Sequence, residues 1–438
     1  MKIAIIHSHL NNRGGSQRYV IEIANNFKKL GVDVNIFCYE YNKKLCFQEL
    51  TYNLNIKKIY TRENVFEDKN SYKKSNILKK YLKLFYNVKM IRRIANSIGI
   101  DYLFSLYVTN KNASKVAELM LNNHDDYDLI FAHEEPLSVY AAIKYKKNKN
   151  IPIYWFCYDS IEKWFLEWKV EYHNSFIRNF LLKQIYFKYD RYLINKFVDK
   201  SAVLDKKMSQ RYFKLYGKLP LIRRGGLPKN VIGYGRENKI REKFNLSDNI
   251  NIILLLTRFV KYKRVHDIFD VYMKLDDGIR KNIFIYINAP VTDQLYYQWC
   301  IDKYKEVLEN NNIILDLEFS GNDNEMYDMY LSSDIFVFPN DNQTWGHAPL
   351  ESMGCGTAAL VSSGCGISEV VKSITPEAVF EVGNIHELTD MIENMVKSRS
   401  YKKISEKQKD YVKNNLVWED VCKIYIADFK DILGNKHV

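Results

Sequence analysis

The sequence of 438 residues predicts an α/β protein built from two doubly wound, Rossmann-like domains. Short apolar runs alternate with longer amphipathic segments, which is typical of a parallel sheet covered by helices on both faces. These runs form two series, separated by a turn-rich stretch. A chain of this length, 47% hydrophobic, holds two or three domains at about 100–200 residues each, and we expect two.

The first series of buried strands is expected at residues 3–6, 34–38, 129–132, 153–157 and 202–204. The second series is expected at residues 252–256, 283–287, 313–319, 335–338 and 358–361. Between them, residues 217–247 carry KLP, RRGGLP and GYGREN, a turn composition that predicts the linker. We therefore predict a first domain at 1–225 and a second at 226–417. Residues 418–433 have helical apolar spacing and can pack on either domain.

Composition limits the partners and the compartment. A net charge of +13 favours an anionic partner, which nucleotide phosphates, acidic lipid headgroups and nucleic acid all satisfy. The seven cysteines form no C-x-x-C pair and their number is odd, which favours a reducing cytoplasm. The amino end lacks the features of a signal peptide, and no segment reaches about 18 uninterrupted apolar residues. We expect neither export through a signal peptide nor a transmembrane helix.

Polar residues that directly follow apolar runs are the candidates for a site, because ligands of open α/β sheets bind beyond the carboxyl ends of the strands. After the first run, Gly14 and Gly15 let the backbone pass close to a bound group before a helix that starts near Ser16. An ordinary strand-to-helix turn explains the pair about equally well. His133 follows the run 129–132 and can bind a sugar hydroxyl or offset positive charge at a reacting carbon. The alternative is a strand-end histidine that neighbouring backbone groups satisfy.

A cationic pair follows the run 252–256. The Arg258 guanidinium can grip phosphate oxygens through two parallel hydrogen bonds, and the Lys263 ammonium adds a point charge. Together they can neutralise a departing diphosphate without a metal. Chance pairs of this kind are common in so basic a chain. The position of Arg258 and Lys263 between a buried apolar run and an amphipathic helix favours a role in ligand binding.

Residues 343–369, QTWGHAPLESMGCGTAALVSSGCGISE, combine a tight turn, a short helix, a buried strand and a second glycine-rich turn. The first free N–H groups of the short helix suit a phosphate. Glu351 lies one turn into that helix and can accept both hydroxyls of a ribose, the alternative being an exposed helix carboxylate. The second turn and Glu369 face the same cleft or cap a helix. The candidate binding residues here are Trp345, Gly346, His347, Ala348 and Glu351.

From these motifs, the chain resembles the retaining family-four glycosyltransferases, whose two-Rossmann fold is called GT-B. The likeness runs through the glycine pair, the DLIFAH strand, RFVKYK, FSGND and PNDNQTWGHAPLESMGCGTAALVSS. In that family the cationic pair holds the donor diphosphate, the later glutamate of a Glu-x7-Glu motif holds the ribose, and the earlier one faces the transferred sugar. The earlier position is Gln343 here. Its amide can bind sugar hydroxyls but brings no negative charge, which predicts weaker catalysis or an unusual donor sugar.

The resemblance implies transfer of a hexose from a nucleotide diphosphate sugar, as co-substrate, with retention of configuration, no metal and no protein nucleophile. It implies that residues 418–438 pack back on the first domain, that a central cleft closes over the donor, and that base contacts lie near Gly321 and Asn322. The implied catalytic residues are His133, Arg258, Lys263 and Gln343. The implied donor-binding residues are Gly15, Arg258, Lys263, Trp345, Gly346, His347, Ala348 and Glu351.

Two basic and aromatic stretches, residues 73–98 and 164–197, predict peripheral association with the inner face of an anionic membrane and suit a glycan or lipid-linked acceptor. A helix that packs on the first domain with a solvated basic face is an equal alternative for 73–98. A catalytically silent scaffold that binds a partner enzyme is the competing function, because Gln343 replaces an acid. A nucleic-acid glucosyltransferase is permitted by the charge, but the chain has no recognisable DNA-reading motif, so no nucleic-acid partner is expected.

Overall fold

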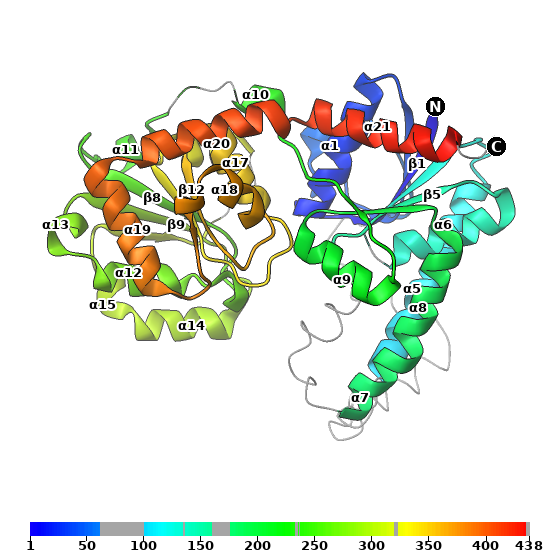
Figure 1. Ribbon diagram of the computed structural model, residues 1–438, viewed down its shortest axis with the longest axis horizontal. Helices are drawn as coiled ribbons and strands as arrows, with labels where there is room; N and C mark the ends of the chain where they lie inside the picture. The colour runs from blue at the N-terminus through cyan, green and yellow to red at the C-terminus, as the bar shows by residue number, and fades with distance from the viewer. Residues whose placement is uncertain are drawn as a thin grey trace. The chain divides into compact units, whose positions relative to one another are not determined.

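The computed structural model describes residues 1–61, 100–134, 136–159, 176–232, 235, 237–318 and 323–434. The chain forms two compact units, shown in Figure 1. Unit 1 comprises Met1–Val203, Met208–Arg223 and Cys422–Val438, and unit 2 comprises Leu204–Lys207 and Arg224–Val421. Each unit is built on one parallel sheet, so the predicted class of two doubly wound, Rossmann-like domains is confirmed.

The sheet of unit 1 has seven parallel strands in the order β3-β2-β1-β4-β5-β6-β7. The chain starts in the middle at β1, moves outward to β3, and then returns to the other side of β1 at β4. The topological switch point of this sheet therefore lies between β1 and β4, where ligand sites form in such folds. The strands are β1 (Lys2–Leu10), β2 (Asp33–Tyr41), β3 (Asn55–Thr61), β4 (Leu129–His133), β5 (Ile153–Phe156), β6 (Lys200–Val203) and β7 (Leu221–Ile222).

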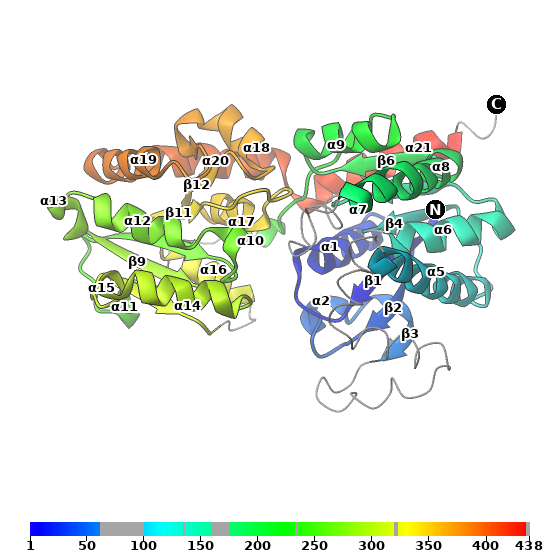
Figure 2. The ribbon, with the colours of Figure 1, turned by 90° about the horizontal axis from the view of Figure 1, so that it is seen from below.

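Helices cover both faces of this sheet, as Figures 1 and 2 show. The α7, η4 and α8 segments follow one another without a break and form one long helical run that extends beyond the sheet. The helices are α1 (Gly15–Lys29), α2 (Gln48–Thr51), α5 (Ile100–Leu121), α6 (Leu137–Lys149), α7 (Phe176–Leu181), the π-helix η4 (Leu182–Tyr186), α8 (Phe187–Phe197), α9 (Lys206–Tyr216) and α21 (Trp418–Gly434).

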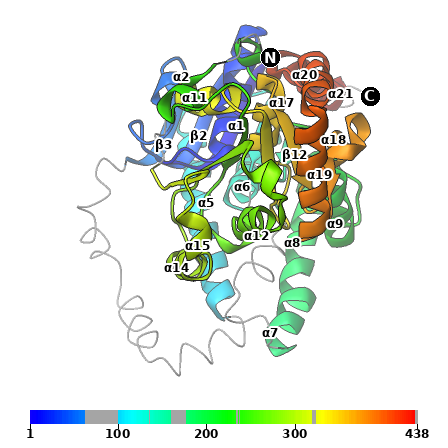
Figure 3. The ribbon, with the colours of Figure 1, turned by 90° about the vertical axis from the view of Figure 1, so that its left-hand side faces the viewer.

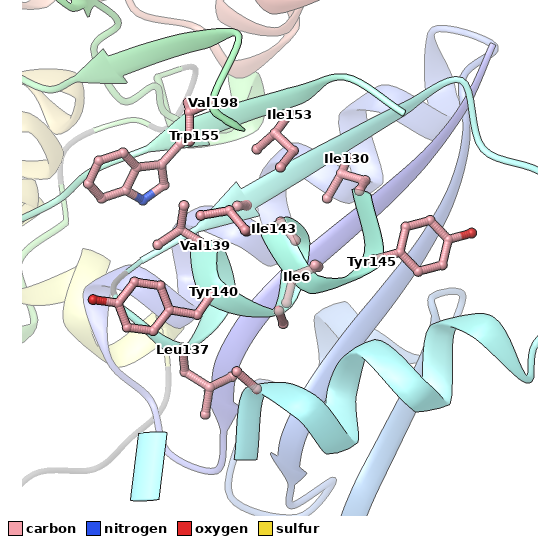
Figure 4. Close-up of a cluster of buried hydrophobic side chains, with 14 of the residues drawn as sticks. Ile6, Ile130, Leu137, Val139, Tyr140, Ile143, Tyr145, Ile153, Trp155 and Val198 are labelled. Carbon is pink, nitrogen blue, oxygen red and sulfur yellow. The ribbon is translucent and has the colours of Figure 1, made fainter. Parts of the chain in front are cut away.

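Alternate side chains of the central strands enter two different cores. Ile130, Ile153 and Trp155 pack with α5 and α6 in the cluster drawn in Figure 4. Phe131 and Tyr154 enter the other core, where their rings lie 5.5 and 5.2 Å from the ring of Phe429 on α21. Because both faces are buried, both sets of alternating residues are apolar, which explains the continuous apolar runs of the sequence.

The sheet of unit 2 has six parallel strands in the order β10-β9-β8-β11-β12-β13. The chain again starts in the middle, at β8, and crosses to the other side at β11. The switch point of unit 2 therefore lies between β8 and β11. The strands are β8 (Asn251–Leu256), β9 (Ile283–Asn288), β10 (Ile313–Asp316), β11 (Ile335–Phe338), β12 (Ala358–Ser362) and β13 (Val379–Phe380).

Many short helices surround this second sheet, and Figure 3 shows α18, α19 and α20 grouped on one flank of unit 2. The helical segments are α10 (Lys229–Ile232), α11 (Lys239–Lys243), the 3-10 helix η5 (Lys261–Lys263), α12 (His266–Lys274), α13 (Asp277–Arg280), α14 (Gln294–Lys303), α15 (Lys305–Leu308), α16 (Asp323–Leu331), α17 (His347–Cys355), α18 (Ser368–Ile374), η6 (Pro376–Ala378), α19 (Ile385–Ser398) and α20 (Tyr401–Asn415).

A buried amide completes the hydrogen bonding of β12. Strand β13 is so short that it pairs only with Val361 and Ser362. Further along β12, the Gln408 side chain from α20 accepts a bond from the Ala359 N–H at 2.9 Å and donates to the Ala359 carbonyl at 3.1 Å. The Gln408 amide therefore takes the place of a neighbouring strand, as buried backbone groups require.

Candidate functional site

Three loops meet at the carboxyl edge of the sheet in unit 2. The Asp341 N–H, after β11, donates to the Tyr262 carbonyl, after β8, at 2.8 Å. The Gln343 N–H donates to the Gly364 carbonyl, after β12, at 3.2 Å, and the Gly366 N–H donates to the Gln343 carbonyl at 2.9 Å. Backbone bonds therefore fix the loop after β11 between its two neighbours at the switch point.

Lys263 is the charged residue at the centre of these loops. Its side chain is buried, with 8% exposure, and its Nζ donates to Gln343 Oε1 at 2.6 Å. The Asn340 amide, turned so that both of its groups are satisfied, accepts from the same Nζ at 3.0 Å. The structure thus brings together Lys263 and Gln343, which lie 80 positions apart in the sequence. A cation is held between two neutral amides at the switch point.

Arg258 lies on the same loop as Lys263 but is exposed. Its Nη2 donates to the Tyr262 hydroxyl at 2.9 Å, which is its one side-chain hydrogen bond among the described residues. A guanidinium carries five N–H donors. Most of its donors therefore remain available to an anion.

The turn from β11 into α17 has an unusual backbone. Trp345 has a φ of 54° and Gly346 a φ of 148°. A Cβ on Gly346 would lie 3.2 Å from both Ile367 Cγ2 and Phe338 Cε1, so space and conformation both require glycine here. The Trp345 N–H donates to Asp205 Oδ2 at 3.1 Å, and its side chain is buried.

The start of α17 presents a small set of backbone donors. The Trp345 N–H already has a partner, and Pro349 has no N–H. The helix begins at His347, so the N–H groups of His347 and Ala348 point out of its first turn, where an anion can meet them.

Glu351 is a buried carboxylate and not an exposed helix side chain. It retains 5% exposure, and the Tyr330 hydroxyl donates to its Oε2 at 3.4 Å. A buried carboxylate is costly unless it has hydrogen-bond partners. Because Glu351 is buried on α17, the alternative of a solvent-exposed helix carboxylate is excluded.

In unit 1, the predicted residues Gly15 and His133 lie at the other switch point. Gly15 is the first residue of α1, and His133 is the last residue of β4. The His133 ring is fully buried and stacks on Phe156, with 4.9 Å between centroids and 10° between planes. Burial holds the pKa of His133 well below its usual range, so the imidazole is neutral. Within the described residues, neither ring nitrogen has a hydrogen-bond partner.

Two further residues beside His133 were not predicted from the sequence. His7 on β1 lies opposite His133 in the strand register and is also fully buried, which lowers its pKa to about 3. Glu134 follows β4 directly, and its Oε2 lies 3.4 Å from His7 Nε2. Burial raises the pKa of Glu134 to about 7. The available signal was its place immediately after an apolar run, the rule that had singled out His133.

Some predicted features fall outside the described residues. These are the basic stretch 73–98, residues 164–175 of the second aromatic stretch, and Gly321 and Asn322. In the described parts of the chain, no helix is long and apolar enough to cross a bilayer.

Comparisons with known proteins agree with this architecture. The model of "Glycosyltransferase Family 4" matches residues 13–197, and that of "Glycosyl transferases group 1" matches residues 236–416. An N-acetyl-alpha-D-glucosaminyl L-malate synthase of Bacillus anthracis is 19% identical over 196 residues, 44% of this chain and 49% of the relative. The chain thus matches about half the length of that curated relative.

Solved structures share the fold across both units. HepE of Anabaena, in complex with UDP and glucose, has a TM-score of 0.69 at 13% identity, with 98% of this chain and 100% of that chain covered. Sucrose-phosphate synthase of Thermosynechococcus elongatus has a TM-score of 0.69 at 12% identity, with 99% and 100% covered. At this identity the likeness establishes the fold alone. The two family models each match about two fifths of the chain, one in each unit, and the protein belongs to the family-four glycosyltransferases with the GT-B fold.

Proposed function

We propose that the protein transfers a hexose from a nucleotide diphosphate sugar to a glycan or lipid-linked acceptor, with retention of configuration and without a metal. The observation that carries this proposal is the Lys263 ammonium, held at the switch point of unit 2 by Gln343. It lies on loops shared with Arg258 and the start of α17, and this combination suits a pyrophosphate. The solved relative that contains UDP and glucose supports a nucleotide-sugar donor.

The candidate site residues of unit 2 have separate roles in this proposal. Arg258 and Lys263 bind the diphosphate oxygens and stabilise the charge that develops as the bond to the sugar breaks. The N–H groups of His347 and Ala348 add neutral donors. Glu351 accepts the hydroxyls of the ribose, and Gln343 binds a hydroxyl of the hexose.

In unit 1, we propose that Gly15 lets the backbone of the β1–α1 loop approach the donor. His133 offers a neutral imidazole to the sugar, with its carbonyl and ring dipoles. The acceptor oxygen forms the new bond to the anomeric carbon, the bond to the diphosphate breaks on the same face, and the acceptor proton passes to the leaving phosphate. No protein nucleophile takes part.

The test is titration of UDP by calorimetry. Lys263→Ala removes the cation held at the switch point and is expected to weaken UDP binding by about tenfold or more, equivalent to about 1.4 kcal/mol. Lys261→Ala is the matched control, because Lys261 is exposed on the same 3-10 helix. Equal UDP affinity in the wild type and both variants would refute the proposed donor site.

Gln343 favours one competing function, a catalytically silent scaffold that recruits a partner enzyme. The amide keeps the contact with Lys263 but adds no negative charge near a developing oxocarbenium ion. Sugar transfer or donor hydrolysis across a panel of nucleotide sugars separates the two functions. Turnover by the wild type that disappears in Arg258→Ala supports the enzyme. Inertness with every donor, together with retained UDP binding, supports the scaffold.

We further propose that the protein acts at the cytoplasmic face of an anionic membrane, through one side of α7, η4 and α8. Large apolar side chains are exposed along this helical run, and Lys183, Lys188 and Arg191 lie exposed among them. Apolar rings that enter the interface and cations that meet lipid phosphates are the combination that binds such surfaces. The exposed apolar residues are Phe176, Ile177, Phe180, Ile185, Tyr189 and Tyr192.

Co-sedimentation with phosphatidylglycerol vesicles at low salt tests this surface. The variant Phe176→Ser with Phe180→Ser should lose most of the bound fraction. Leu295→Ser is the matched control, because Leu295 is 86% exposed on α14 of unit 2. Wild-type binding to neutral phosphatidylcholine at the same level, or no binding at all, would contradict the proposal.

A further inference from the structure

Resting on the proposed donor site of unit 2, we propose that Asn340 is a positioning residue of that site. Its side-chain amide holds the Lys263 ammonium in the orientation that meets a diphosphate, and it does so without cancelling the positive charge. Asn340 acts through Lys263 and does not touch the donor itself. This fully buried residue was not among the site residues predicted from the sequence.

The Asn340 amide contacts both the side chain and the backbone of Lys263. In the orientation that satisfies both of its groups, the amide oxygen accepts from Lys263 Nζ at 3.0 Å, and the amide nitrogen donates to the Lys263 carbonyl at 3.2 Å. The charge of the ammonium dictates this orientation, because a cation attracts the amide oxygen and repels the NH2 group. One side chain therefore fixes the backbone of Lys263 and also orients its ammonium.

Asn340 is itself held rigidly, as a positioning residue must be. It follows β11, it is fully buried, and its carbonyl accepts a hydrogen bond from the Ser362 hydroxyl of β12. The N–H of the next residue, Asp341, donates to the Tyr262 carbonyl at 2.8 Å, which ties the same loop to the loop after β8. Gly364 packs so closely that a Cβ there would lie 2.9 Å from the Asn340 carbonyl oxygen. Neighbouring loops on both sides therefore fix the backbone of Asn340.

Lys263 gains from this arrangement because a lysine side chain is flexible and loses conformational freedom when its ammonium binds a phosphate. In the folded protein that freedom is already restricted. The Nζ atom donates to Gln343 Oε1 at 2.6 Å and lies 5.5 Å from the centroid of the Phe338 ring. Asn340, Gln343 and Phe338 are all neutral. An aspartate at position 340 could also accept from Nζ, but its charge would offset that of the ammonium, whereas an amide leaves the positive field available to an anion.

A double-mutant cycle on UDP affinity, measured by calorimetry, tests this role. Lys263→Ala, Asn340→Ala and the double variant are compared with the wild type. Each single variant should weaken UDP binding by about tenfold, because hydrogen bonds that involve a charged group are strong. The double variant should match Lys263→Ala within about twofold, because Asn340 then has no ammonium to position. A residue that only supports the fold would add its own loss to that of Lys263→Ala.

Asn340→Asp keeps the size of the side chain and its acceptor oxygen but places a negative charge beside Lys263. This variant should weaken UDP binding by about tenfold or more, because the carboxylate offsets the ammonium and repels the diphosphate. Should Asn340→Ala fail to fold, Asn340→Asp carries the test.

Uridine reports whether the rest of the site is intact, because it has no phosphate for Lys263 to bind. Its affinity, measured by NMR titration, should stay within about twofold of the wild-type value in every variant. Asn394→Ala, at an exposed asparagine of α19, is the matched control and should leave the affinities for UDP and uridine unchanged.

Three outcomes overturn the role of Asn340 while the donor site stands: Asn340→Ala binds UDP as tightly as the wild type, the two single losses add in the double variant, or the affinity for uridine falls as much as the affinity for UDP. A failure of the proposed function looks different. In that case Lys263→Ala binds UDP as tightly as the wild type, or the wild type binds no UDP, and the role of Asn340 falls with the donor site.

Discussion

Glu134 illustrates at the scale of one residue how a fold raises the free energy of an ionised group. The side chain is 23% exposed, and the hydrogen bond that Ser16 donates to it does not compensate fully for burial, so its pKa rises from 4.5 to about 7. The folded state therefore holds a proton that the unfolded chain has already released. The contribution of Glu134 to the free energy of unfolding is fully present below pH 4.5. It is lost as the pH rises from 4.5 to about 7, and it does not change further above pH 7.

Glu134→Gln removes this titration and should stabilise the protein at pH 8 but not at pH 4.5. A rise of the pKa from 4.5 to about 7 corresponds to about 3–4 kcal/mol, because one pKa unit is worth about 1.4 kcal/mol. Thermal unfolding of the wild type and the variant at both pH values measures the difference. Glu118→Gln, at an exposed carboxylate of α5, is the control and should gain nothing at either pH. An equal gain for Glu134→Gln at both pH values would contradict the assignment.

The residues of the candidate site differ in how far sequence reasoning could find them. Lys263 and Gln343 were each predicted, but their contact was not, because it depends on β8 and β11 becoming neighbours in the sheet. Glu134 was missed although it follows an apolar run, because its strained φ and its contact with a buried histidine on another strand leave no trace in local sequence. The bond from the Trp345 N–H to Asp205 was missed for the same reason.

At the scale of elements, ten apolar runs predicted ten strands, and each run corresponds to an observed strand. Three edge strands of the two sheets, β3, β7 and β13, were not predicted. β3 contains two consecutive lysines and no buried residue, so it lacks the apolar run that predicts a strand, and β7 and β13 have two residues each, too few for any periodic signal. The run 313–319 was predicted too long, since β10 ends at Asp316. The helix expected at 418–433 is confirmed as α21.

Strand β12 depends on α20 through a single side chain, and this dependence can be measured. Gln408→Ala removes three buried hydrogen bonds, to the Ala359 N–H, the Ala359 carbonyl and Thr375 Oγ1. Buried groups left without partners cost about 1–3 kcal/mol each, so we expect roughly 2–4 kcal/mol of destabilisation after partial relaxation. Denaturant unfolding checks this value. Lys407→Ala, at the exposed neighbouring position, should change stability little.

At the scale of the whole molecule, the chain returns to its first unit after building the second. Cys422–Val438 belongs to unit 1, and α21 packs there through Tyr425 and Phe429. The Tyr19 and Tyr425 hydroxyls share a hydrogen bond of 3.0 Å, and Arg223 forms a bidentate pair with Asp428 at 2.7 Å. Aromatic packing and one ion pair therefore hold α21 on the sheet of unit 1.

Phe429→Ala should destabilise unit 1 selectively. Removing a fully buried phenylalanine costs about 3–5 kcal/mol, and the ring contacts that it loses are to Phe27, Phe131, Tyr154 and Tyr425. Hydrogen exchange read by mass spectrometry should show faster exchange in β4 and β5 and unchanged exchange in β8 and β11. Ile424→Ala is the control, because Ile424 is 47% exposed on the same helix. Faster exchange in the sheets of both units would contradict the prediction that Phe429→Ala destabilises unit 1 alone.

The late arrival of α21 has a consequence during translation. The ribosome releases β1 through β7 first, but the aromatic surface around Phe131 and Tyr154 cannot be covered until every strand of unit 2 has been synthesised. For most of its synthesis, the nascent chain therefore exposes an apolar sheet surface that α21 has not yet covered. Chaperones that hold apolar segments are expected to bind that surface, and a premature stop codon before Trp418 should damage the part of the protein that was made earliest.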